Sequence, residues 1–183
     1  MPRMVRNYLP DPIPEDALQR ILERARRHPS AGFTQGIHFV VLTSPDRRRQ
    51  VAHLAGEESY AARGFDRWLS GAPVHVVLVA HAEEYRRRYA EADKGGMDWP
   101  VPYWWVDAGA AFMRLVLAAH EEGLGAGFLG AHRLEGVERL LGIPSEASVV
   151  GLVTLGRPAP DRPSGSIRRG RRNLEEIVHW ETW

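Results

Sequence analysis

The stretch from Trp105 to Glu122 limits the possible folds more than any other part of this sequence. Apolar residues cover most of its helical circumference, and only Asp107 and Arg114 interrupt the longest apolar run. A helix with this pattern is buried on all sides. The two charged residues argue against a membrane span, and Gly123 is a typical helix end. The pattern therefore predicts a central helix inside a large core or inside a dimer.

The rest of the chain predicts strands and helices in one domain. The run from Val74 to Ala80 is almost entirely β-branched or apolar, which is typical of a strand buried on both faces. Because strands and helices do not alternate strictly, the fold class is α+β or three-layer α/β, within a single domain 1–183. We expect further strands over 37–43, 126–129 and 149–155, helices over 14–28, 47–54, 57–69, 83–91 and 134–141, and a helical turn or two within 173–179.

Composition excludes several classes of function. Lys and Arg number 24 and Asp and Glu 23, so the net charge is +1, which disfavours general nucleic-acid or membrane-surface binding. Cysteine is absent, which excludes thiol nucleophiles and Cys-based zinc sites and fits a reducing cytoplasm. Residues 1–6 lack the apolar core of a signal peptide, so we expect a cytoplasmic protein. The eight histidines show no metal-ligand spacing, and no metal is expected.

A glycine-rich segment matches the dinucleotide-binding fingerprint only in its letters. Gly125, Gly127 and Gly130 follow the long helix and lie in a predicted strand, whereas the fingerprint follows a strand and opens a helix. Glycines within a strand instead allow a flat ligand to approach the backbone. We therefore favour a ligand-facing strand over a nucleotide loop.

Two groups of arginines stand near the two ends of the chain. Arg3 and Arg6 precede the first helix, and four arginines fall within 168–172. The second group reads as a solvated tail, a nucleic-acid contact or a phosphate clamp, because guanidinium groups present planar donors to phosphate oxygens. The segment 29–36 is either a plain connection or a surface of small residues on which a ring system lies.

Six short motifs follow one another along the chain: Arg3–Tyr8, Asp11–Pro14, Pro29–Gln35, Val106–Ala110 with Gly123–Gly125, Leu141–Pro144 and Val150–Pro158. Their order carries more information than any one of them. In this order of motifs, the chain resembles the FMN-dependent nitroreductase family over nearly its whole length.

The resemblance implies a fold and a set of cofactor contacts. The fold is a three-layer α+β sandwich with a central, mostly antiparallel sheet flanked by helices, in a domain-intertwined homodimer that binds one FMN at each end of its interface. In this arrangement Arg3 and Arg6 hold the phosphate and the nearby flavin edge. The full set of implied cofactor-binding residues is Arg3, Met4, Arg6, Pro29, Ser30, Ala31, Gly32, Phe33, Gln35, Leu129, Gly130, Ala131, Arg169 and Arg171.

The resemblance also implies roles for the C-terminal arginines, the loop 29–32 and the end of the glycine-rich strand. Arg169 and Arg171 close the phosphate clamp, and 29–32 lie against the isoalloxazine from the other subunit. A backbone N–H at Gly130 or Ala131 lies near the hydride-accepting nitrogen. The sequence departs from the family pattern at Met4, where serine is usual, at Phe33, where asparagine is usual, and at Gly36-Ile37 in place of proline and tryptophan.

The implied function is an oxidoreductase that moves hydride from NADH or NADPH through bound FMN to a nitroaromatic, a quinone or a similar small acceptor. The flavin carries this chemistry, so no side chain is assigned a catalytic role. The loop 94–105 is either a substrate lid or dimer packing. Alternatives are a specialised relative (a dehydrogenase, a dehalogenase or a flavin-fragmenting enzyme), a flavin-binding protein with little turnover, and a nucleic-acid binder. The predicted substrate contacts are Trp68, Trp99, Tyr103 and Trp104.

Overall fold

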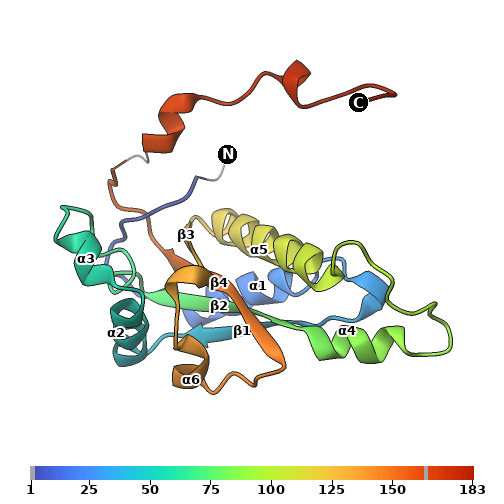
Figure 1. The fold of residues 1–183 in the computed structure, drawn as a ribbon. Helices are drawn as coiled ribbons and strands as arrows, with labels where there is room; N and C mark the ends of the chain where they lie inside the picture. Colours follow the sequence, from blue (N-terminus) through green and yellow to red (C-terminus); the bar gives the residue numbers. More distant parts are fainter. Residues whose placement is uncertain (1–2, 163–164) are drawn as a thin grey trace.

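A computed structural model describes residues 3–162 and 165–183, and a four-stranded antiparallel sheet forms its centre (Figure 1). The sheet order is β1-β2-β4-β3, and each ladder in it is antiparallel. All four strands were predicted, within two residues at each end. Their bounds are β1 Ile37–Leu42, β2 Val74–His81, β3 Gly125–Gly130 and β4 Ala147–Gly156.

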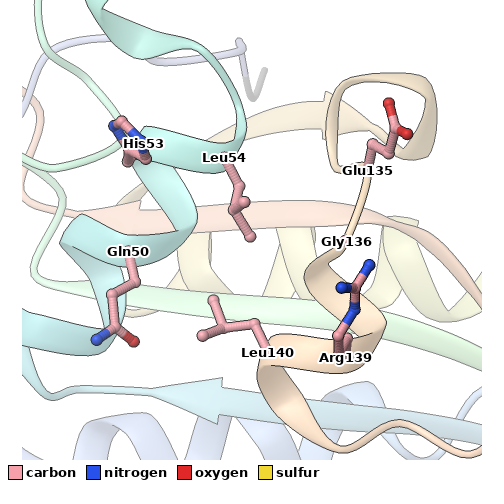
Figure 2. A pocket seen from close by; sticks show the side chains of 7 residues that line it. All are labelled: Gln50, His53, Leu54, Glu135, Gly136, Arg139 and Leu140. Carbon is pink, nitrogen blue, oxygen red and sulfur yellow. The ribbon is translucent and has the colours of Figure 1, made fainter.

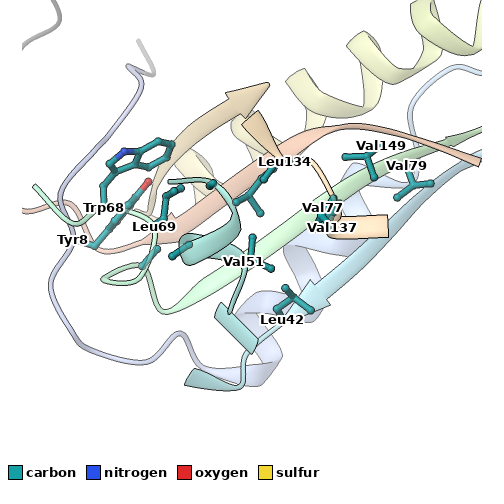
Figure 3. Packing of buried hydrophobic residues seen from close by; sticks show 14 of the residues in the cluster. Tyr8, Leu42, Val51, Trp68, Leu69, Val77, Val79, Leu134, Val137 and Val149 are labelled. Atoms are coloured by element: carbon teal, nitrogen blue, oxygen red, sulfur yellow. The ribbon is translucent and has the colours of Figure 1, made fainter. Parts of the chain in front are cut away.

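Helices cover both faces of this sheet and make three layers (Figure 1). On one face α1 and α5 pack on each other and on the sheet, and on the other face α2 and α6 pack over β2 and β4 (Figure 3). The predicted α+β three-layer fold is therefore confirmed. The helices are α1 Glu15–Ala25, α2 Pro45–Leu54, α3 Glu57–Ala61, α4 Ala82–Tyr89, α5 Tyr103–Glu121 and α6 Val137–Leu141.

Strand β2 forms the middle of the core, as its β-branched sequence predicted. Seven of its eight residues are buried, with Val76 and Leu78 facing the α1–α5 layer and Val77 and Val79 facing the α2–α6 layer. A bulge between Leu78 and Val79 shifts its register against β4. Two-sided burial of this kind fixes the strand strongly, since a slip of one residue would exchange its two faces.

The long helix α5 is buried on only one side in the single chain. Leu115 and Ala119 are fully buried against the sheet, whereas Val106, Met113 and Leu117 are 53%, 45% and 37% exposed. The expected burial on all sides is therefore not reached within one chain, whose core covers one side of the helix. The outer apolar face stays open in the monomer.

Several predicted helix boundaries need correction, since α1 ends at Ala25 instead of residue 28 and α6 begins at Val137 instead of residue 134. The helix expected over 57–69 ends at Ala61, because Gly64 takes a positive φ of 78° and the chain folds back toward Glu57. Pro14 caps α1 from outside instead of occupying its first turn. In the C-terminal region the predicted helical turn is a short 3-10 segment, η4 Leu174–Glu176, preceded by a second one, η3 Gly165–Arg169.

The segment 3–8 runs beside β3 and beside the chain that follows β4. Val5 donates its backbone N–H to Ala126 of β3 at 2.8 Å, and Tyr8 forms a bridge with Pro158. Beyond this point the chain leaves the body as an arm, drawn in red in Figure 1. The arm exposes large apolar side chains, among them Trp180 and Trp183. In the described part of the chain, no helix is both long enough and apolar enough to cross a membrane.

Candidate functional site

A cavity of about 850 Å³ lies where the N-terminal segment, α3, the end of β3 and the arm come together. We call it the arginine cavity. Its walls combine aromatic and aliphatic side chains with three arginines, a combination that suits a flat ligand bearing an anionic group. The lining residues are Arg6, Glu57, Tyr60, Phe65, Asp66, Trp68, Leu69, Phe128, Leu129, Arg162, Gly165, Ile167 and Arg168.

The two N-terminal arginines have different positions. The Arg6 guanidinium lies 6.0 Å from the Trp68 ring centre and lines the cavity. Arg3 instead pairs with Asp161 at 2.5 Å and lines a separate groove beside His120. Burial alone would raise the pKa of Asp161, but hydrogen bonds from the Arg6 backbone and the Arg3 side chain lower it below its usual value. Asp161 therefore stays ionised and fixes Arg3 outside the cavity.

The N-terminal segment is pressed closely against β3. A Cβ added at Gly127 would lie 2.4 Å from the Val5 carbonyl oxygen and 2.9 Å from the Trp68 ring. Only glycine permits this approach. The Tyr8 hydroxyl secures the contact through Val5 O at 2.9 Å and Thr154 Oγ1 at 2.7 Å. The glycine-lined strand predicted from sequence thus admits the protein's own backbone and Trp68 at Gly127.

One wall of the cavity is held by buried polar side chains. The Glu57 carboxylate accepts hydrogen bonds from the backbone N–H groups of Leu69 at 2.7 Å and Ser70 at 3.1 Å. His75 lies within hydrogen-bonding distance of Leu69 O, at 2.7 Å from Nε2. Since a carbonyl oxygen only accepts, Nε2 carries the proton and donates it. Burial lowers the pKa of His75 to about 4, so the ring is neutral at neutral pH.

The loop 29–35 lies at the other end of the sheet. Its backbone turns through positive φ angles at Gly32, Phe33 and Gln35 (60°, 55° and 59°), and Phe33 is 76% exposed. Asp107 of α5 accepts the Ala31 backbone N–H at 2.9 Å. A Cβ at Gly32 would lie 2.9 Å from the Tyr89 ring, so the loop rests directly on α4.

An aromatic cluster adjoins this loop. The Trp99 ring lies 4.5 Å from Tyr89 and 4.8 Å from Tyr103, and Trp104 packs on Tyr85 at 6.1 Å between ring centres. Three of the four predicted substrate residues (Trp99, Tyr103 and Trp104) therefore gather beside the loop. The fourth, Trp68, lines the arginine cavity and is only 8% exposed.

The length of β2 separates the cavity from the loop. Trp68 and Leu69 precede Val74 at the start of the strand, and His81 at its end donates its backbone N–H to Gly36 at 2.9 Å. Seven residue steps at about 3.3–3.4 Å give roughly 23 Å between the two ends of the strand. The Trp68 end of the cavity therefore lies far from the loop, whereas Leu129 extends the cavity toward the middle of the sheet, since it pairs with Leu152 of β4.

The other predicted cofactor residues divide between these regions or pack elsewhere. Met4 packs against the hydrophobic cluster between α1 and α5. Leu129 lines the cavity, and Gly130 and Ala131 lead from β3 into a short 3-10 turn, η2 Ala131–Arg133. Arg169 and Arg171 lie on the exposed arm, where Arg168 lines the cavity in their place. These roles stay predictions.

Sequence reasoning missed several residues of the cavity. Arg168 belongs to the basic cluster within 168–172, but the resemblance implies roles for its neighbours Arg169 and Arg171. Arg162, Tyr60 and Phe65 carry no local pattern, because the return of the chain after α3 and the path of the arm bring them together. Among the described residues, no three or more His, Asp or Glu side chains are placed to hold a metal ion.

A second, wide-open groove of about 660 Å³ lies between α2 and α6 (Figure 2). His53, Glu135 and Arg139 make its rim polar, and Leu54 and Leu140 point into it. None of the residues predicted to bind cofactor or substrate lines this groove. The arginine cavity is therefore the better candidate.

Comparison with known proteins supports this view of the fold. The family model described as "Nitroreductase family" matches residues 3–157. A "Putative NADH dehydrogenase/NAD(P)H nitroreductase" of Methanothermobacter thermautotrophicus is 28% identical over 188 residues, which cover 99% of this chain and 83% of that protein. An "NADH dehydrogenase" of Thermus thermophilus is 30% identical over 201 residues, covering 97% and 91% respectively.

A solved structure has a similar fold at lower sequence identity. The NADPH:FMN oxidoreductase from Vibrio harveyi, complexed with NAD+, superposes with a TM-score of 0.75 at 23% identity. The match covers 99% of this chain and 74% of that one. At this identity the likeness establishes a shared fold.

Proposed function

This chain belongs to the nitroreductase family, and on that premise we propose that it is an FMN-dependent oxidoreductase that transfers hydride from NADH or NADPH to a small organic acceptor. The observation that carries the proposal is the arginine cavity, with three guanidinium groups beside aromatic walls. Nitroaromatics and quinones are the acceptor classes that we expect.

The residues of the cavity fit FMN chemically. Arg6, Arg162 and Arg168 line one space and supply donors for a phosphate group. Each charge-assisted hydrogen bond of this kind is worth about 1.5–3 kcal/mol. Trp68 and Phe128 offer apolar surface to a planar ring, and the volume of about 850 Å³ suits a ligand of this size.

The bound flavin would supply the capacity to accept and release hydride. The protein's own residues position it, exclude water and set the local charge. Arginines beside the ring and phosphate favour anionic forms electrostatically. The buried wall formed by Glu57 and His75 keeps Trp68 and Leu69 in place, so that the apolar side of the cavity is ready before a ligand enters.

We further propose that a second copy of the chain completes each site. The loop 29–35 and the Trp68 wall of the cavity lie beside opposite ends of β2, whose length is roughly 23 Å. The open apolar face of α5 and the exposed apolar arm provide surface that a partner would cover. In a symmetric dimer, the loop of one subunit would then face the cavity of the other.

A spectroscopic experiment tests the function. The purified protein should be yellow, and anaerobic NADH or NADPH should bleach the visible flavin bands. Adding a nitroaromatic or a quinone should restore the colour. A colourless protein that also fails to take up added FMN would contradict the proposal. A protein that binds FMN but is never bleached would be a flavin-binding protein without this activity.

A further inference from the structure

A buried carboxylate links the long helix to the loop 29–35. Asp107, in α5, is 5% exposed, and its Oδ2 accepts hydrogen bonds from the Tyr85 hydroxyl at 2.6 Å and the Ala31 backbone N–H at 2.9 Å. Tyr85 belongs to α4 and is fully buried. One oxygen atom therefore ties together α5, α4 and the loop.

The donors of this link are stable to changes in pH. Burial, followed by the hydrogen bond to Asp107, raises the pKa of Tyr85 well above its usual value. The hydroxyl therefore stays protonated and donates. Within the loop, Ser30 Oγ accepts the Gln35 backbone N–H at 2.7 Å. This hydrogen bond joins the two ends of the loop, next to the Ala31 N–H that Asp107 accepts.

Further hydrogen bonds turn the loop's polar groups inward. The Phe33 N–H donates to Ser30 O at 2.9 Å, and Arg88 Nε donates to Gly32 O at 2.9 Å. Phe33 is left as the large side chain that the loop presents to solvent, at a φ of 55°. A bulky residue in this region is strained, and such strain persists only where the surroundings determine the conformation.

We propose that Asp107 and Tyr85 are positioning residues that hold the loop 29–35 in the shape required to lie against the flavin ring bound by the other subunit. This inference rests on the proposed function. It assigns the ring contact to the loop and the phosphate contact to the arginine cavity. The two contributions to binding affinity can therefore be separated by comparing a flavin that has the phosphate with one that lacks it.

Riboflavin and FMN provide that separation, because riboflavin has the ring and lacks the phosphate. Dissociation constants are measured by fluorescence titration of full-length protein stripped of flavin. Tyr85→Phe should weaken FMN and riboflavin by the same factor, about tenfold, as expected for one lost hydrogen bond. Arg6→Ala should weaken FMN at least tenfold more than it weakens riboflavin.

Two further variants separate positioning from general stability. Asp107→Asn keeps an oxygen that can accept both hydrogen bonds, so it should bind both flavins within about threefold of the wild type, whereas Asp107→Ala should not. Ile21→Val makes a small cavity in the core under α1, away from the loop, and should leave both constants unchanged.

The outcomes distinguish this inference from the function on which it rests. A wild-type protein that binds neither flavin would overturn the proposed function and the inference with it. A wild-type protein that binds both, with Tyr85→Phe unaffected or weakened for FMN alone, would overturn only the positioning role. The positioning role would be established if Tyr85→Phe weakened the binding of both flavins equally and Asp107→Asn kept the binding that Asp107→Ala loses.

Discussion

The loop 29–35 and the arginine cavity differ in how completely a single chain builds them. The loop is fixed by buried groups of its own subunit, with Asp107 and Tyr85 beneath it. The cavity has one comparably fixed wall, at Leu69 and Ser70, but its arginines come from the exposed arm and from the N-terminal segment. One region is thus rigid before any ligand binds, while the other gathers its charges from chain termini. The difference suggests that ring recognition is preorganised and that phosphate binding draws in the termini.

The strongest test of this comparison combines a substitution in the arginine cavity with a substitution beneath the loop 29–35. Arg6→Ala impairs the cavity and Asp107→Ala impairs the loop, and each homodimer should lose nearly all activity. A heterodimer carrying one of each would have one site with both defects and one site with none. Isolated through two affinity tags, it should recover about half of the wild-type activity, because the proposed symmetric dimer would have two equivalent sites.

A matched pair controls for this recovery. A heterodimer of Arg6→Ala with Arg168→Ala carries both defects at cavity ends, so each of its sites keeps one and it should stay impaired. Equal activity in the two heterodimers would show that each site is built within one chain. The loop would then have no part in a shared site.

Acid should loosen the cavity wall before it affects the loop. His75 has a folded pKa of about 4 against 6.5 in the unfolded chain. The unfolded state therefore binds the proton first as the pH falls, and the stabilising contribution is lost between pH 6.5 and 4. The loss amounts to about 3 kcal/mol. Urea unfolding across this range should show a smaller decrease for His75→Gln, which can still donate to Leu69 O.

Regional hydrogen exchange sharpens the same prediction. Amides near 69–72 should lose protection as the pH falls toward 4, after the observed exchange rates are corrected for the pH dependence of intrinsic amide exchange. Amides of the loop 29–35 should keep theirs. Parallel stability curves for the wild type and His75→Gln would contradict the assigned role of His75.

Regular elements of this fold follow from local pattern, and the site does not. The β-branched run at Val74–Ala80 and the long apolar helix were predictable because burial on a sheet or helix leaves a periodic trace. The end of α3 at Ala61 was not, since it depends on Gly64 and on a distant carboxylate at Glu57. Motif order singled out Arg6, which lines the cavity, and its cofactor role stays a prediction. Motif order could not show that Asp161 turns Arg3 away, because that contact joins residues 158 positions apart.

The arm carries several neighbouring arginines, and a further prediction concerns which of them contacts the phosphate. Arg168 lines the cavity, while the motif alignment favours Arg169 and Arg171. We expect Arg168→Ala to weaken FMN at least tenfold, since each charge-assisted bond contributes about 1.5–3 kcal/mol. Flavin released on gel filtration measures this loss. A larger loss in Arg171→Ala than in Arg168→Ala would mean that the arm shifts its register when the ligand binds.

The smallest predicted effect concerns backbone strain at Phe33 in the loop 29–35. Phe33 holds a φ of 55° while 76% exposed, so its side chain gains little from burial within its own chain. Phe33→Gly should relieve a backbone cost of about 1–2 kcal/mol, offset in part by the entropy of glycine. A net gain of about 1 kcal/mol would raise Tm by roughly 2–4 °C. Phe33→Asn should behave similarly, since asparagine tolerates this region, whereas Phe33→Val should lower Tm. If all three variants melt below the wild type, then Phe33 is held by contacts in the dimer that outweigh its strain, and the loop is not complete in one chain after all.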